Sequence, residues 1–137
     1  MSTTQPIRSK QLLHDFKEYY LTKQSNSRNY TLILIGLNTA LRINDILHLT
    51  WGDVYCTEHS RFYTHLLITE KKTEKETRIL INRELQETLL SYRKTQPSIA
   101  DTDYLFPSPR KTSSPLSRYQ AYRIVRKAAE AVGIEDV

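Results

Sequence analysis

The sequence predicts an α+β fold that is mainly helical, with the helices packed around a small antiparallel β-hairpin. In most of the 137 residues, apolar side chains recur three and four positions apart, the spacing of an amphipathic helix. Only the middle of the chain, residues 62–82, is rich in β-branched and aromatic residues around a polar turn. With 39% hydrophobic residues, 26% charged residues and three glycines, the composition is typical of a soluble, helix-rich globular protein.

The N-terminal part should form two helices. The first carries apolar residues at helical spacing, namely Leu12, Leu13, Phe16, Tyr19 and Tyr20. Ser25-Asn26-Ser27 supplies a break and an N-cap for the second helix. Residues 30–37 of that helix are apolar nearly all round, which places it at the centre of the core. We expect Gly36 to allow a close contact with another helix.

The middle of the chain should form a long β-hairpin followed by a helix. The strands are predicted at residues 62–69 and 78–82, with a charged turn over residues 70–77. Asn82 can cap the next helix, whose inward residues are Leu85, Leu89 and Tyr92 and which ends before Pro97.

The C-terminal part should form an apolar anchor, a loop and a final helix. The anchor is the segment from Tyr104 to Pro107, and a loop rich in serine and proline follows it. Ser117 and Gln120 have capping-box spacing, and Gly133 can close the helix that begins there. The buried stripe of this helix is predicted to be Ala121, Ile124, Val125, Ala128 and Val132.

The distribution of charge indicates a polyanionic partner. The net charge is +5, yet residues 104–129 contain no acid at all. That segment carries six cations, namely Arg110, Lys111, Arg118, Arg123, Arg126 and Lys127. An acid-free cationic surface is expected of a protein that binds the phosphate backbone of double-stranded DNA. The single Cys56 can form no internal disulfide, and no apolar run is long enough for a membrane span, so a cytoplasmic protein is expected.

One segment combines an arginine and an acid at the start of a short apolar helix. Ile43, Ile46 and Leu47 should share a buried face. Arg42 should lie in the first turn, where unpaired backbone N–H groups favour an anion. Asp45 can hold the guanidinium or a neighbouring N–H group in place.

This segment resembles the first motif of the tyrosine recombinases, Thr-Gly-x-Arg-x-x-Glu-Leu followed by Leu-x-Trp-x-Asp-Ile. The residues that match in order are Thr39, Arg42, Asp45, Leu49, Trp51 and Asp53. The sequence departs from the usual form at Ala40, where glycine is usual, and at Asp45, where glutamate is commoner. We expect the alanine to require a backbone without a positive φ. Weaker resemblance extends over residues 7–137, so the predicted fold is that of the first half of a recombinase catalytic domain.

The resemblance implies a metal-free reaction without a cofactor. These enzymes break DNA through a 3′-phosphotyrosine link and then rejoin strands. Arg42 would be one of the two arginine clamps on the phosphate. The family's lysine acid lies in a β-hairpin turn, and Lys72, directly before Thr73, is the first choice, with Lys71 and Lys75 as alternatives. Lys71 and Lys75 are otherwise predicted to contact DNA.

The rest of the family's active site is not found in these 137 residues. The second motif is His-x-x-Arg, and none of the four histidines has an arginine three residues later. None of the nine tyrosines occupies the position of the nucleophile. We therefore expect residues 1–137 to be a single truncated catalytic domain, inactive alone, with no separate N-terminal core-binding domain. Other recombinase protomers on DNA are expected as partners.

Three other interpretations fit parts of the sequence. The chain could be a non-catalytic DNA-binding remnant or decoy of a recombinase, which the basic C-terminal segment supports equally well. A zinc site could use Cys56 and His59 with His65 or His48, but no second pair has zinc-finger spacing. A helix-turn-helix regulator would need an uninterrupted helical order, which the predicted hairpin breaks.

Overall fold

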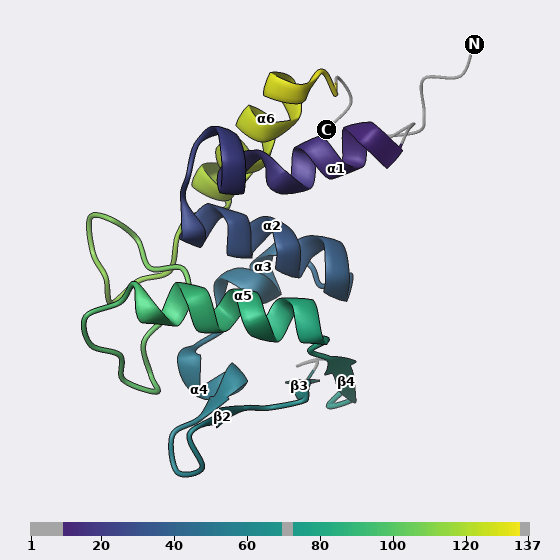
Figure 1. Ribbon diagram of the computed structural model, residues 1–137. Helices are drawn as coiled ribbons and strands as arrows, with labels where there is room; N and C mark the ends of the chain where they lie inside the picture. Colours follow the sequence, from purple (N-terminus) through teal and green to yellow (C-terminus); the bar gives the residue numbers. More distant parts are fainter. Residues whose placement is uncertain (1–9, 70–72, 135–137) are drawn as a thin grey trace.

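The computed structural model describes residues 10–69 and 73–134, which form a mainly helical α+β fold as predicted (Figure 1). The helices are α1 (Lys10–Glu18), the π-helix η1 (Tyr19–Lys23), α2 (Ser27–Thr39), α3 (Ile43–Leu47), α4 (Trp51–Val54), α5 (Arg83–Lys94) and α6 (Arg118–Val132). The strands are β1 (Tyr55–Cys56), β2 (Arg61–Phe62), β3 (His65–Thr69) and β4 (Glu76–Leu80). In Figure 1, α1 and α6 lie side by side at one end, and the strands lie toward the other end.

Helix α2 is the centre of the core, as its apolar sequence predicts. Five consecutive residues, from Thr31 to Ile35, are buried, so the helix is covered on all sides along that stretch. Asn26 caps its N-terminus by accepting a 3.0 Å hydrogen bond from the backbone N–H of Asn29. The expectation for Gly36 was wrong, because this residue is exposed and a Cβ built on it would meet nothing within 4 Å.

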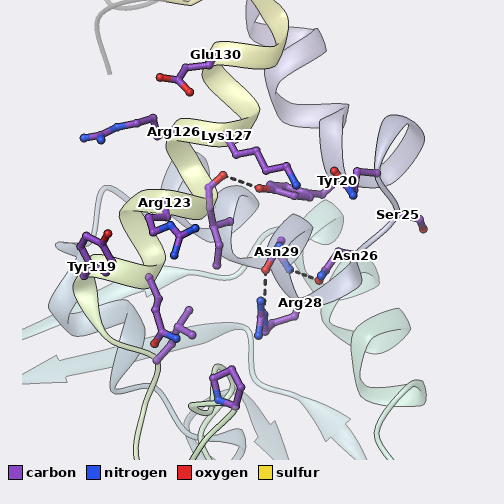
Figure 2. A pocket seen from close by; sticks show the side chains of 15 residues that line it. Tyr20, Ser25, Asn26, Arg28, Asn29, Tyr119, Arg123, Arg126, Lys127 and Glu130 are labelled. Carbon is purple, nitrogen blue, oxygen red and sulfur yellow. Dashed lines mark hydrogen bonds between the residues drawn. The ribbon is translucent and has the colours of Figure 1, made fainter.

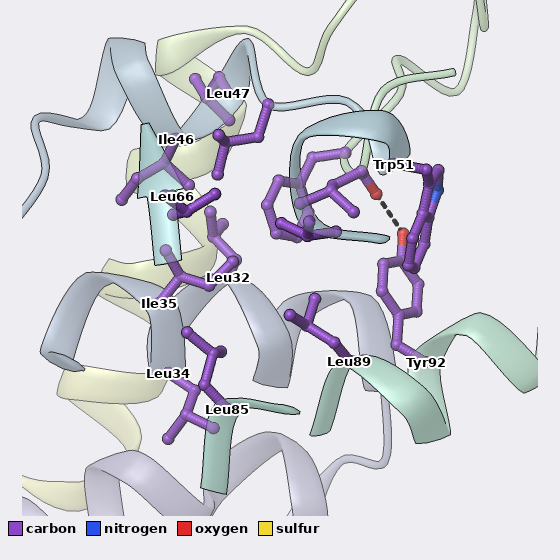
Figure 3. Close-up of a cluster of buried hydrophobic side chains, with 14 of the residues drawn as sticks. Leu32, Leu34, Ile35, Ile46, Leu47, Trp51, Leu66, Leu85, Leu89 and Tyr92 are labelled. Atoms are coloured by element: carbon purple, nitrogen blue, oxygen red, sulfur yellow. Dashed lines mark hydrogen bonds between the residues drawn. The ribbon is translucent and has the colours of Figure 1, made fainter. Parts of the chain in front are cut away.

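The main hydrophobic cluster joins α2 to α3, α4, β3, α5 and the segment around Leu105 (Figure 3). Tyr92 of α5 is stacked against Phe106 and tilted against Trp51. Its hydroxyl donates a hydrogen bond to the carbonyl of Leu105, so the buried phenol has a partner. Burial raises the pKa of Tyr92 to about 12.

A second hydrophobic cluster joins the two ends of the described chain. It contains Phe16, Tyr19, Tyr20, Ile33, Ala128, Ala129 and Ile134. The Tyr20 hydroxyl donates a 2.7 Å hydrogen bond to the carbonyl of Ile124 in α6. Burial raises the pKa of Tyr20 to about 12, although the positive charge of Arg28 lowers it in part. The N-terminal helices are thus fixed directly to the last helix.

The predicted hairpin is present, but its first strand is shorter than expected. Strands β3 and β4 pair antiparallel, with His65 opposite Leu80 and Thr69 opposite Glu76. The strand predicted over residues 62–69 is broken after β2, because the N–H of Tyr63 donates to the carbonyl of Val54. Strand β2 pairs with β1 instead, as a separate two-stranded sheet.

The caps of α5 and α6 follow the sequence prediction. The Asn82 side chain accepts a 2.9 Å hydrogen bond from the N–H of Leu85 at the start of α5. Ser117 and Gln120 form a capping box at the start of α6, and Gly133 ends this helix with φ +90. No helix within residues 10–69 and 73–134 has the length and apolar character that crossing a membrane would require.

Candidate functional site

Arg42 lies in the short link between α2 and α3, and its side chain is exposed. It is the N-cap residue of α3, with φ −69 and ψ 148, and so precedes the first turn in which we expected it. The backbone prediction for Ala40 was also wrong. This residue has φ +57 and ψ +18, a left-handed conformation that ends α2. The glycine usual at this position would adopt that conformation without the steric cost imposed by a Cβ.

Thr39 holds the turn that presents Arg42. Its buried hydroxyl donates a 2.7 Å hydrogen bond to the carbonyl of Ile35, one helical turn earlier. The same oxygen accepts a 3.3 Å hydrogen bond from the backbone N–H of Leu41. One side chain therefore bonds to the last turn of α2 and to the residue before Arg42, which explains why a threonine suits this position.

Asp45 does not hold Arg42 in the structure. The carboxylate is half-buried on α3, and the described residues offer it neither a hydrogen bond nor an ion pair. The structure therefore does not show the predicted contact of Asp45 with the Arg42 guanidinium or with a neighbouring N–H group. The Arg42 side chain is left exposed, with its donors available to an anion.

The hairpin strand and the helix that follows Arg42 contribute to the same hydrophobic cluster. Leu66 of β3 and Ile46 of α3 are both buried in the main cluster (Figure 3). From Leu66, strand β3 continues to Thr69 at the base of the predicted lysine turn. This shared cluster thus connects the base of the turn to the Arg42 helix through close-packed side chains.

The lysine turn lies partly outside the described residues. Lys71 and Lys72 belong to residues 70–72, so the structure does not place the first-choice lysine or one of its alternatives. The other alternative, Lys75, is exposed just before β4, and its backbone N–H donates a 3.3 Å hydrogen bond to the Thr73 hydroxyl.

The second half of the motif has a structural role. Asp53 accepts a hydrogen bond from the N–H of Thr50 and completes a capping box at the start of α4. The N–H groups of Trp51 and Gly52 donate to the carbonyls of Asp103 and Asp101 at 2.9 and 2.8 Å. These bonds tie α4 to the loop after α5, while the buried Trp51 ring packs against Tyr92 of α5.

The predicted DNA-binding cations are all exposed where the structure describes them. Arg110 and Lys111 lie in the loop before α6, and Arg118, Arg123, Arg126 and Lys127 lie along α6. Arg123, Arg126 and Lys127 line a groove of about 690 Å³ between α6 and the start of α2 (Figure 2). Arg118, Arg110 and Lys111 are not part of its lining.

Sequence reasoning missed Arg28, which enters the same groove from α2. No motif marks this residue, and nearly one hundred residues of sequence separate it from α6. Only the packing of α2 and η1 against α6 brings the charges together. A signal of this kind lies in the tertiary structure and not in any local pattern.

Comparison with known sequences and structures agrees with this geometry. The sequence profile of the phage integrase family matches residues 5–137. The chain belongs to the phage integrase family. A relative, the probable integrase/recombinase YoeC of Bacillus subtilis (strain 168), is 43% identical over 137 residues, which cover 100% of this chain and 69% of that protein.

Two solved structures of recombinases have the same fold as this member of the phage integrase family. The crystal structure of XerA recombinase aligns with a TM-score of 0.76 and 22% identity, and covers 99% of this chain. The Tn1549 transposon integrase in complex with circular intermediate DNA aligns with a TM-score of 0.59 and 19% identity over 96% of this chain. In both cases the 137-residue chain spans 46% of the solved chain.

Proposed function

We propose that this protein takes part in site-specific DNA recombination or integration through a 3′-phosphotyrosine link. In this proposal Arg42 binds the scissile phosphate and Lys72 acts as the acid for the leaving 5′-oxygen. Asp45 supports the site through its place on the Arg42 helix. The observation that carries the proposal is the burial of Leu66 and Ile46 in one hydrophobic cluster, because this cluster links the hairpin base to the Arg42 helix.

The chemistry fits these residue types. Phosphoryl transfer needs cations on the non-bridging oxygens as charge redistributes, and an acid for the leaving oxygen. The guanidinium of Arg42 can bind two oxygens at once, and it has no carboxylate partner among the described residues. Lysine can serve as the acid because its pKa responds strongly to its surroundings.

We also propose that double-stranded DNA is the partner, bound in part by Lys71, Lys75, Arg110, Lys111 and the cations of α6. The exposure of the α6 cations and the absence of acids in residues 104–129 support this. The similar Tn1549 integrase was solved in complex with DNA, which also supports it. Other recombinase protomers are proposed as further partners on the DNA.

The 137 residues alone should not cleave DNA. They contain no His-x-x-Arg sequence, so the second arginine clamp and its histidine would have to come from elsewhere. A non-catalytic DNA-binding remnant is the second candidate function, and the basic groove beside α6 favours it to the same degree.

A cleavage assay tests the proposal on the protein made from the whole open reading frame that contains this chain. The substrate is nicked duplex DNA carrying the protein's own recombination site, and the product is a covalent complex that survives denaturation. Arg42→Ala and Lys72→Ala should each slow its formation by about 100-fold or more, as expected when one transition-state contact is lost. Arg42→Lys should restore only part of the rate, because lysine lacks the planar fork.

Arg61→Ala is the matched control, because this exposed arginine lies on β2 and outside the motif. It should cleave at the parent rate. Full activity of Arg42→Ala would refute the assignment of the clamp. A whole protein that binds its site but forms no covalent complex would favour the non-catalytic function.

A further inference from the structure

The groove between α6 and the start of α2 collects positive charge from two separate elements. Arg28 lies on the α2 side, and Arg123, Arg126 and Lys127 lie on the α6 side. In Figure 2, Arg28 and Arg123 point toward the same hollow, whereas Arg126 points away from it. The one carboxylate in the lining is that of Glu130, at the far end of α6.

These cations have no carboxylate partners in the part of the chain that the structure describes. The single ion pair between described residues joins Lys17 to Glu84, on other elements. Like charges that converge without a counter-charge repel each other, and this repulsion is relieved when an anion binds between them. The groove is thus built to accept negative charge.

Arg28 is held in place before any ligand arrives. Its Nε donates a 2.9 Å hydrogen bond to the Oδ1 of Asn29, which is only 7% exposed. The backbone of Asn29 is held in turn by the Asn26 cap. Because the Nε is engaged, the terminal nitrogens of the guanidinium remain for a ligand in a fixed orientation, which lowers the entropy lost on binding.

The size and lining of the groove indicate what kind of anion it binds. About 690 Å³ is far more space than a single phosphate ion fills, and the cations come from both walls. Leu116, Ile124 and Pro109 contribute apolar surface to the lining. Alternating phosphates and deoxyribose carbons of a DNA strand match this combination of separated cations and apolar surface.

We infer that this groove binds the sugar-phosphate backbone of DNA, with Arg28 on one wall and Arg123 and Lys127 on the other. The inference rests on the proposed function, in which double-stranded DNA is the partner. It adds a contact from α2 that no sequence motif marks. It also gives Tyr20 a positioning role, because its hydrogen bond to Ile124 connects the two sides of the groove.

The test measures binding of a fluorescent DNA duplex to the 137-residue chain by anisotropy over a range of salt concentrations. Arg28→Ala and Arg123→Ala should each weaken binding about tenfold at moderate salt, the effect of one charged hydrogen bond. Each should also reduce the slope of log K against log salt by about 0.9, and the double variant by about 1.8. Arg123 is exposed on α6, so its variant tests the groove even if Arg28→Ala disturbs folding.

Two controls separate this inference from the proposed function. Arg61→Ala removes the same charge at the opposite end of the molecule and should bind like the parent (Figure 1). Arg118→Ala changes α6 outside the groove. If Arg118→Ala weakens binding while Arg28→Ala and Arg123→Ala match Arg61→Ala, the groove assignment is overturned and DNA binding stands. If the parent chain shows no salt-dependent affinity for DNA, both the groove assignment and the proposed DNA partner are refuted.

Competition by inorganic phosphate distinguishes a polymer from a small anion. At constant ionic strength, millimolar phosphate should not displace the duplex, because one ion meets only part of the groove. Displacement of the duplex from the parent but not from Arg28→Ala would show a site for a single free anion and would overturn the assignment to a DNA backbone.

Discussion

The hydroxyl of Tyr20 donates a 2.7 Å hydrogen bond to the backbone carbonyl of Ile124, across the boundary between η1 and α6. Tyr20→Phe removes this bond and leaves the ring in the second cluster. We expect a loss of about 1 kcal/mol in the free energy of unfolding, the net worth of one such hydrogen bond. Urea denaturation gives this value, and Tyr122→Phe on the exposed face of α6 is the control. Equal stability of the two variants would show that the bond contributes nothing.

Two substitutions, Gly36→Ala within α2 and Ala40→Gly at its C-cap, should both stabilise the protein. Ala40 has φ +57, so Ala40→Gly relieves the left-handed strain and should add about 0.5–1 kcal/mol to the free energy of unfolding. Gly36 lies in the helix with open space around it, so Gly36→Ala should add about 0.8 kcal/mol. Thermal denaturation measures both. A drop in melting temperature for Ala40→Gly would contradict the backbone geometry given for this turn.

Gly52 should tolerate no side chain. A Cβ at this position would lie 3.0 Å from the carbonyl oxygen of Asp101, and the N–H of Gly52 donates to that same oxygen. Gly52→Ala should therefore cost about 1–3 kcal/mol, because backbone and not a flexible side chain would have to move. Urea denaturation should give Gly52→Ala a lower midpoint than the parent and Gly36→Ala a higher one. A higher midpoint for both variants would contradict the close contact at Gly52.

Stability should fall at alkaline pH because of two buried tyrosines. Burial raises the pKa of Tyr20 and of Tyr92 to about 12, above the ordinary value of 10.0. Between pH 10 and 12 the unfolded chain loses these protons and the folded chain keeps them, so unfolding becomes more favourable as pH rises. Each tyrosine alone contributes a slope of at most about 1.4 kcal/mol per pH unit. Denaturation at several pH values measures the slope.

The phenylalanine variants separate these tyrosines from other groups. Tyr92→Phe should show a smaller fall in stability above pH 10 than the parent, although it starts lower because the Leu105 carbonyl loses its partner. Tyr119→Phe is the control, because Tyr119 is exposed. A parent whose stability is flat up to pH 12 would contradict the burial argument.

Much of the fold could be predicted from local patterns, because caps and amphipathic stripes act within a few residues. The predicted caps of α2, α5 and α6 are all present. They are formed by Asn26, by Asn82, and by Ser117 with Gln120. The break between β2 and β3 could not be predicted, since it depends on a hydrogen bond from Tyr63 to Val54. The positive φ of Ala40 could not be predicted from the steric preference of alanine, because the end of α2 imposes it.

The candidate site was predictable in the same uneven way. The motif around Arg42 predicted the family, and the comparison with known proteins confirms this prediction. The roles of Arg42, Lys72, Asp45 and the DNA-binding cations stay predictions. The place of Arg28 in the groove could not be predicted, because it depends on the packing of η1 against α6. Local spacing carries no information on which distant charges will converge.

The packing of the first helices on the last one also affects how the protein is made. Tyr20 and Ile124 are 104 residues apart in sequence. A ribosome that adds roughly 5–20 residues per second takes on the order of 5–20 s between them. Throughout that time, the apolar faces of α1 and η1 can pack only against α2, and the second cluster closes only after α6 has emerged. This late step should delay full protease resistance of the N-terminal helices until α6 has emerged.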